Sequence, residues 1–115
     1  MSLYLAQIAY TPEAWQALVR NPQDRFEAVR PAVEKLGGKL VSAWFAFGDY
    51  DIVAVTDMPS NVAAAAISIA FAAGGACKTV KTTPLLTTAE ALEALKAAGT
   101  SGYRPATAAA AASRK

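Results

Sequence analysis

The chain is predicted to fold as an α+β domain with the ferredoxin-like order β-α-β-β-α-β, a four-stranded antiparallel sheet and an extra C-terminal helix. Three observations support this prediction. Runs typical of strands occupy residues 2–10, 39–47, 52–57 and 76–83. Helix-start signals follow the first and third of these runs. The second and third runs are separated by only four residues, which predicts a hairpin at the centre of the chain.

The first helical region extends from Thr11 to Leu36. Thr11 is expected to cap it, with Pro12 at its first position. Asn21-Pro22 repeats the same start signal, so the helix is expected to break and resume there. Pro31 lies inside the second part, where we expect a kink over residues 27–30, and Gly37 ends the region.

The hairpin strands are rich in aromatic and β-branched residues. Strict alternation would place Val41, Ala43, Phe45 and Phe47 on one face of the sheet and Leu40, Ser42, Trp44 and Ala46 on the other. Residues 48–51, Gly-Asp-Tyr-Asp, are typical of a tight turn.

The remaining elements follow in order. An alanine-rich helix is expected over residues 61–73, and Lys78 and Lys81 suit an edge strand. Thr87 and Glu90 have the spacing of a capping box and predict a final short helix. We therefore expect one domain over residues 1–99 and a disordered, alanine-rich tail over residues 100–115.

Composition excludes several function classes. Three of the eleven basic residues lie beyond residue 99, so the first 99 residues carry eight basic and nine acidic side chains. This part of the chain lacks the excess of positive charge that is typical of a nucleic-acid-binding domain. Histidine is absent and Cys77 is the only cysteine, so we expect no metal site and no cofactor.

The pattern of apolar residues predicts a cytoplasmic protein with no membrane contact. The N-terminal strand follows no basic segment, so no signal peptide is expected. The apolar part of the longest uncharged run, residues 62–73, is shorter than the ~20 residues of a spanning helix.

Both faces of the predicted sheet carry large apolar side chains, and 54% of the residues are hydrophobic against 17% charged. Helices can cover only one face, and an exposed apolar patch usually marks a partner site. We therefore expect a homodimer in which two sheets pack together as a dimeric α/β barrel. An edge-paired trimer is the alternative.

The chain resembles the GYD-domain family, whose Gly-Tyr-Asp signature corresponds to Gly48, Tyr50 and Asp51. The segments Thr-Pro-Glu, Leu-Gly-Gly-Lys-Leu and Lys-Thr-Thr-Pro-Leu-Leu-Thr are also similar, and the likeness covers roughly residues 3–98. The resemblance implies a small α+β protein of the dimeric α/β-barrel type. It supplies no catalytic residues.

The signature turn is open to two interpretations. In the structural one, Gly48 allows a positive φ while Asp49 and Asp51 bond backbone amides. In the functional one, Trp44, Gly48, Tyr50 and Asp51 bind a ligand at the mouth of the barrel. A metal site formed by Asp49, Asp51 and Asp57 is disfavoured because the spacing matches no known loop.

Several other residues have both a structural and a functional interpretation. Cys77 is expected to be a small buried hydrophobe; a nucleophile activated by the adjacent Lys78 is disfavoured because no base is evident. Arg25 is expected on a solvated helix face, and phosphate binding on that face is the less favoured interpretation. An aromatic cavity between the sheet and the helices is a further possibility; its members would be Tyr4, Tyr10, Trp44, Phe45 and Phe47.

Two functions follow from these observations. The favoured one is an oligomeric module that binds a small molecule or serves an assembly role. The alternative is a cofactor-independent enzyme similar to the small monooxygenases and isomerases on dimeric α/β barrels, with Trp44, Tyr50 and Asp51 in place of the missing histidine. An RNA-binding role is disfavoured because the third strand, Ile-Val-Ala-Val, lacks stacking aromatics.

Overall fold

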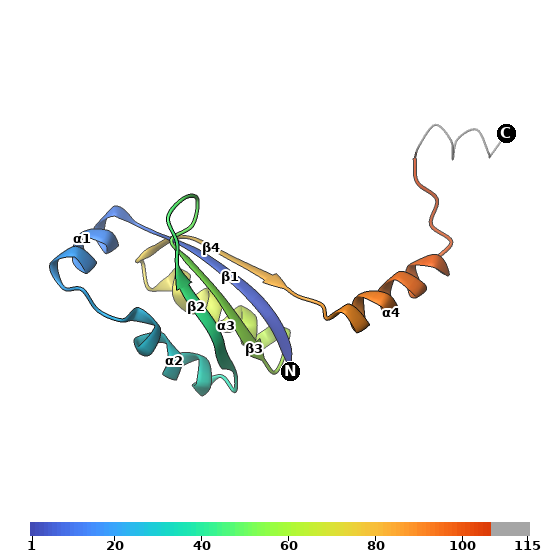
Figure 1. Ribbon diagram of the computed structural model, residues 1–115, viewed down its shortest axis with the longest axis horizontal. Helices are drawn as coiled ribbons and strands as arrows, with labels where there is room; N and C mark the ends of the chain where they lie inside the picture. Colours follow the sequence, from blue (N-terminus) through green and yellow to red (C-terminus); the bar gives the residue numbers. More distant parts are fainter. Residues whose placement is uncertain (107–115) are drawn as a thin grey trace. The chain divides into compact units, whose positions relative to one another are not determined.

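The computed structural model describes residues 1–106, and the chain divides into two compact units, Met1–Leu85 and Leu86 onward. The elements in chain order are β1 (Ser2–Tyr10), α1 (Pro12–Arg20), α2 (Arg25–Lys35), β2 (Lys39–Phe45), β3 (Ile52–Met58), α3 (Asn61–Ala73), β4 (Cys77–Pro84) and α4 (Thr88–Gly99). The strands form one antiparallel sheet in the order β2-β3-β1-β4 (Figure 1). The predicted ferredoxin-like α+β class is confirmed, with β4 at an edge.

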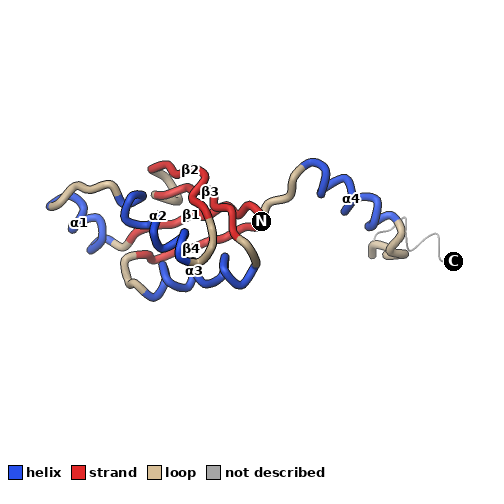
Figure 2. Tube along the Cα trace, turned by 90° about the horizontal axis from the view of Figure 1, so that it is seen from below, coloured by secondary structure: helices blue, strands red, loops and turns tan. Residues whose placement is uncertain are grey.

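The first unit has two layers, because α2 and α3 lie against one face of the sheet, while α1 follows the end of β1 (Figure 2). The core between the layers is centred on Met58 of β3 and Val33 of α2, which are fully buried. Ala64 and Ile67 of α3 pack against them. Burial of side chains of this size contributes about 1.5–3 kcal/mol each, so this cluster holds the helices to the sheet.

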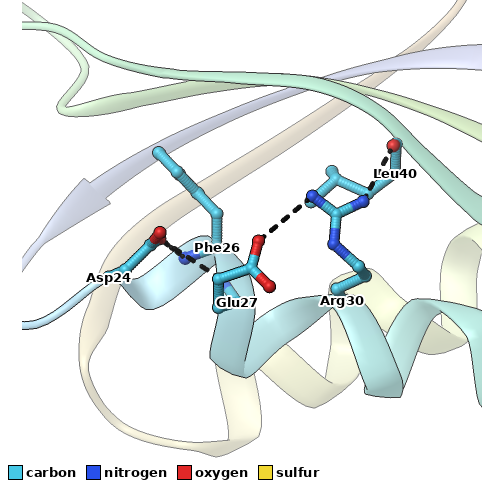
Figure 3. Close-up of polar contacts among 5 residues, drawn as sticks. All are labelled: Asp24, Phe26, Glu27, Arg30 and Leu40. Carbon is cyan, nitrogen blue, oxygen red and sulfur yellow. Dashed lines mark hydrogen bonds and ion pairs between the residues drawn. The ribbon is translucent and has the colours of Figure 1, made fainter.

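The break predicted at Asn21 is present and separates two helices, α1 and α2. α2 begins at Asp24, whose side chain accepts hydrogen bonds from the backbone N–H groups of Phe26 (3.0 Å) and Glu27 (3.3 Å) (Figure 3). Arg30 then joins Glu27 (3.4 Å) to the Leu40 carbonyl oxygen of β2 (3.5 Å) (Figure 3). These contacts fix the start of α2 over β2, and Pro31 lies inside the helix as predicted.

The alternation predicted for β2 is wrong at its start. The register with β3 shifts between Leu40 and Ser42. Leu40 therefore faces the helices and is buried with Phe26 and Ala43, although strict alternation put it on the side of Trp44. A bulge inserts one extra residue and turns the following side chains to the other face.

The face of the sheet opposite the helices is apolar and largely exposed. Leu3, Val41 and Trp44 are 37%, 51% and 67% exposed. Leu5 of β1 lies beside Val55 of β3, and both are half-buried. The expected second apolar face is therefore present in the single chain.

The second unit contains α4, which begins with the predicted capping box between Thr87 and Glu90. Its large apolar side chains, including Leu92 and Leu95, are exposed within this unit. Within residues 1–106, no helix has the length and apolar character needed to cross a bilayer. The predicted tail lies partly outside the described residues, which end at 106, and its disorder stays a prediction.

Candidate functional site

A cavity of about 380 Å³ lies between the sheet and the three helices of the first unit. Most of its wall is apolar and comes from β1, β3 and all three helices. The lining residues are Ala6, Ile8, Tyr10, Ala14, Ala17, Leu18, Gln23, Arg25, Phe26, Val29, Val33, Leu40, Ile52, Ala54, Thr56, Ala70, Phe71, Gly74, Ala76 and Cys77.

Small residues on facing surfaces leave this space. Ala6 and Ala54 are neighbours in the sheet, where they point toward the helices. The helices contribute Ala14, Ala17 and Ala70 to the cavity wall. Protein interiors are otherwise packed to the density of organic crystals, so alanine facing alanine, with no large side chain to fill the gap, opens a cavity.

Five polar residues line the cavity beside the apolar wall: Tyr10, Gln23, Arg25, Thr56 and Cys77. Tyr10 and Cys77 are opposite each other in the ladder between β1 and β4, next to a register shift. Arg25 is the first residue of α2, and its Nη1 donates a hydrogen bond to Gln23 Oε1 at 2.9 Å. The register of β1 with β4 therefore positions Tyr10 and Cys77, and the start of α2 positions Arg25.

Two of these groups keep their protons at neutral pH. Burial raises the pKa of the Tyr10 phenol above 10.0, with the nearby Cys77 adding to the effect and Arg25 opposing it. Burial likewise raises the pKa of the Cys77 thiol above 9.0, again opposed by Arg25. The cavity therefore offers an uncharged O–H, an uncharged S–H and a guanidinium.

The predicted ligand-binding residues Trp44, Gly48, Tyr50 and Asp51 do not line this cavity. Trp44 is on the opposite face of the sheet, beside Val53. Gly48 has a φ of +149°, a backbone conformation that favours glycine because it has no Cβ, and there is open space around it. Tyr50 is half-buried in the same loop. Ligand binding by these four residues stays a prediction.

Asp51 bonds a backbone amide, as the structural interpretation of the turn predicted. Its Oδ2 accepts a hydrogen bond from the Tyr10 backbone N–H at 2.8 Å, and its own N–H donates to the Ile8 carbonyl oxygen at 2.8 Å. Its carbonyl oxygen accepts from the Ala46 N–H at 2.8 Å. Asp51 thus joins the hairpin turn to the end of β1, where Tyr10 enters the cavity wall.

A family profile for the GYD domain matches residues 4–95, which include the cavity, most of α4 and all of the sheet except the first two residues of β1. The chain belongs to the GYD-domain family. Neither the curated proteins nor the solved structures contain a match. In this GYD domain the signature residues Gly48, Tyr50 and Asp51 form the turn after β2, and Asp51 connects that turn to the cavity through Tyr10.

Most of the residues that line the cavity were predicted from the sequence to have other roles. Of the aromatic set expected to line a cavity, only Tyr10 does so; Phe45 packs on Phe26, and Tyr4 belongs to the core. Arg25 was expected on a solvated face, yet it is half-buried. The signal that would have located the site is the set of alanines facing one another from strands and helices.

Proposed function

We propose that this GYD domain is a non-catalytic module that binds a small, mostly apolar molecule in the cavity between its sheet and its helices. The observation that carries the proposal is the cavity itself, with an apolar wall and a group of polar residues. Its volume falls at the small end of the ~300–1,000 Å³ typical of ligand sites. Such sites usually combine a mainly apolar wall with a few polar groups that orient the ligand.

The protonation states of the cavity residues favour binding over catalysis in the cavity. A nucleophile or general base has to give up its proton readily near neutral pH. Burial holds the protons on Tyr10 and Cys77 instead. Neutral hydroxyl and thiol groups are hydrogen-bond donors, a role that suits recognition of a ligand.

We also propose that the module is a homodimer joined through the sheet face opposite the helices. That face presents Leu3, Val41 and Trp44 to solvent in the single chain. Lys39 and Asp57 are opposite each other on its adjoining strands, so this part of the face carries one charge of each sign. The cavity lies on the other side of the sheet and remains complete within one chain.

Native mass spectrometry of protein purified gently from cells tests the binding proposal. We expect wild-type protein to carry an additional small mass, and Ala54→Phe to lose it because the new ring fills the cavity from β3. Ala65→Phe is the matched control: Ala65 is exposed on α3 and outside the cavity wall, so this variant should retain the adduct. An adduct retained equally by both variants, or absent from the wild type, would contradict the proposal.

A further inference from the structure

The cavity also indicates the chemical class of its ligand, an inference that depends on the binding function proposed above. We propose that the ligand is a monocarboxylic acid with a compact apolar body, bound with its carboxylate against Arg25. Three features of the cavity lead to this conclusion: an arginine with no acidic partner, neutral donors beside it, and an apolar wall.

Arg25 has N–H groups that are available to bind a ligand. Its side chain is half-buried in the cavity wall, and its recorded hydrogen bond is to the neutral Gln23 side chain at 2.9 Å. In the described residues the one ion pair joins Arg30 to Glu27, so no carboxylate neutralises Arg25 there. A guanidinium carries five N–H groups in a planar fork, and most of them are free for a ligand.

The groups around Arg25 favour an anion. The arginine lowers the pKa of both Tyr10 and Cys77 against the larger effect of burial, which places its charge close to both. Asp51 also acts on Tyr10, but more weakly than Arg25 does. Of the other nearby acids, Asp24 caps α2 and Glu27 pairs with Arg30. The positive charge therefore predominates at this part of the cavity.

A carboxylate suits these donors better than a phosphate does. Arginine binds a carboxylate through two parallel N–H···O bonds, which are among the stronger hydrogen bonds in proteins. A phosphate would bring a second negative charge and a third oxygen, whereas Arg25 is the one basic residue in the lining. One guanidinium with neutral O–H and S–H donors matches a single negative charge.

The rest of the wall sets the size and polarity of the remaining part of the ligand. Phe26, Val29, Ile52 and Phe71 present apolar surface to the cavity. A volume of about 380 Å³ equals roughly a dozen water-sized volumes at ~30 Å³ each. The body is therefore a short aliphatic chain or a single ring.

NMR titration of the full chain with matched acid and amide probes at pH 7 tests the inference. Phenylacetate and phenylacetamide form the aromatic arm, and octanoate and octanamide the aliphatic arm. In at least one arm we expect the acid to bind about tenfold more tightly than its amide, as is usual for hydrogen bonds to a charged group. Arg25→Gln should abolish that preference while amide binding persists, which also shows that the variant is folded.

Arg20→Gln provides the matched control, because Arg20 is exposed on α1 and outside the cavity wall. It should retain the full preference for acid. Equal binding of acid and amide, or a preference that survives Arg25→Gln, would overturn the carboxylate inference and leave the binding function standing. Failure of all four probes to bind would also overturn the inference, while the native mass spectrometry described above decides the binding function separately.

Discussion

At the scale of single residues, burial decides the chemistry of the cavity. Tyr10 and Cys77 lie across the edge ladder from each other, and both keep their protons because the charged forms would lose solvation. Arg25 opposes this effect at both residues without overcoming it. One charged and two neutral donors therefore lie close together.

The raised pKa of Cys77 gives a pH dependence of stability with a definite sign. A thiol whose pKa is higher in the folded state holds its proton longer there, so the folded state binds more protons. The contribution to stability is complete below the ordinary value of about 9.0 and is lost as pH rises through the folded pKa. We expect the free energy of unfolding to fall between pH 8 and pH 10, measured by urea denaturation.

Cys77→Ala separates this effect from other titrations. The variant should show a shallower decline over the same pH range, with the remainder due to Tyr10, whose pKa is also raised. An identical pH profile in the variant and the wild type would contradict the assignment to Cys77.

The sequence predicted residue roles well where local rules apply and poorly where distant segments meet. Thr11, Gly37 and the pair Thr87–Glu90 act as predicted, because each acts on its own helix end. Arg25 does not, because its burial depends on α1, α2 and the sheet coming together. No residue pattern within α2 indicates that Arg25 is buried there.

At the scale of elements, the strands and helices fall close to their predicted bounds, and the exceptions have physical causes. β2 contains a bulge after Leu40 that reverses the expected face of that residue. The residues Leu-Val-Ser carry no glycine to signal it. The helical region breaks after Arg20, as predicted, and resumes only at Arg25, because the Asp24 side chain caps two backbone N–H groups there.

The cavity is also a property of elements. β1, β3, α1 and α3 each place alanine at the facing positions, and every one of these alanines is unremarkable in its own element. In the alanine-rich α3, Ala63 and Ala64 pack in the core between helix and sheet. One turn or more farther along, Ala70 borders open space instead.

At the scale of the whole molecule, the two faces of the sheet have different roles in the proposed function. The helix-covered face holds the cavity, and we propose that the opposite face packs against a second copy. An apolar sheet face as exposed as this one is typical of an interaction surface. The two sites use different sets of side chains, so each can be disabled separately.

Trp44→Lys tests the dimer. Trp44 is 67% exposed on the opposite face, so a lysine there leaves the core intact but puts an unpaired charge into the proposed interface. We expect light scattering with size-exclusion chromatography to show a dimer for wild type and a monomer for the variant at the same micromolar concentration. Phe47→Lys is the control, because Phe47 is fully exposed beyond the end of β2. A monomeric wild type, or equal loss in both variants, would contradict the dimer.

The central claim is that a small molecule binds between the sheet and the helices, and an isotope-filtered NOESY spectrum tests it most directly. The sample is the methyl-labelled chain with phenylacetate. We predict intermolecular NOEs from the ring protons to the methyl groups of Val29 and Ile52, which line the cavity. NOEs confined to Leu5 and Val55 on the opposite face, or no intermolecular NOEs at saturating probe, would contradict the claim.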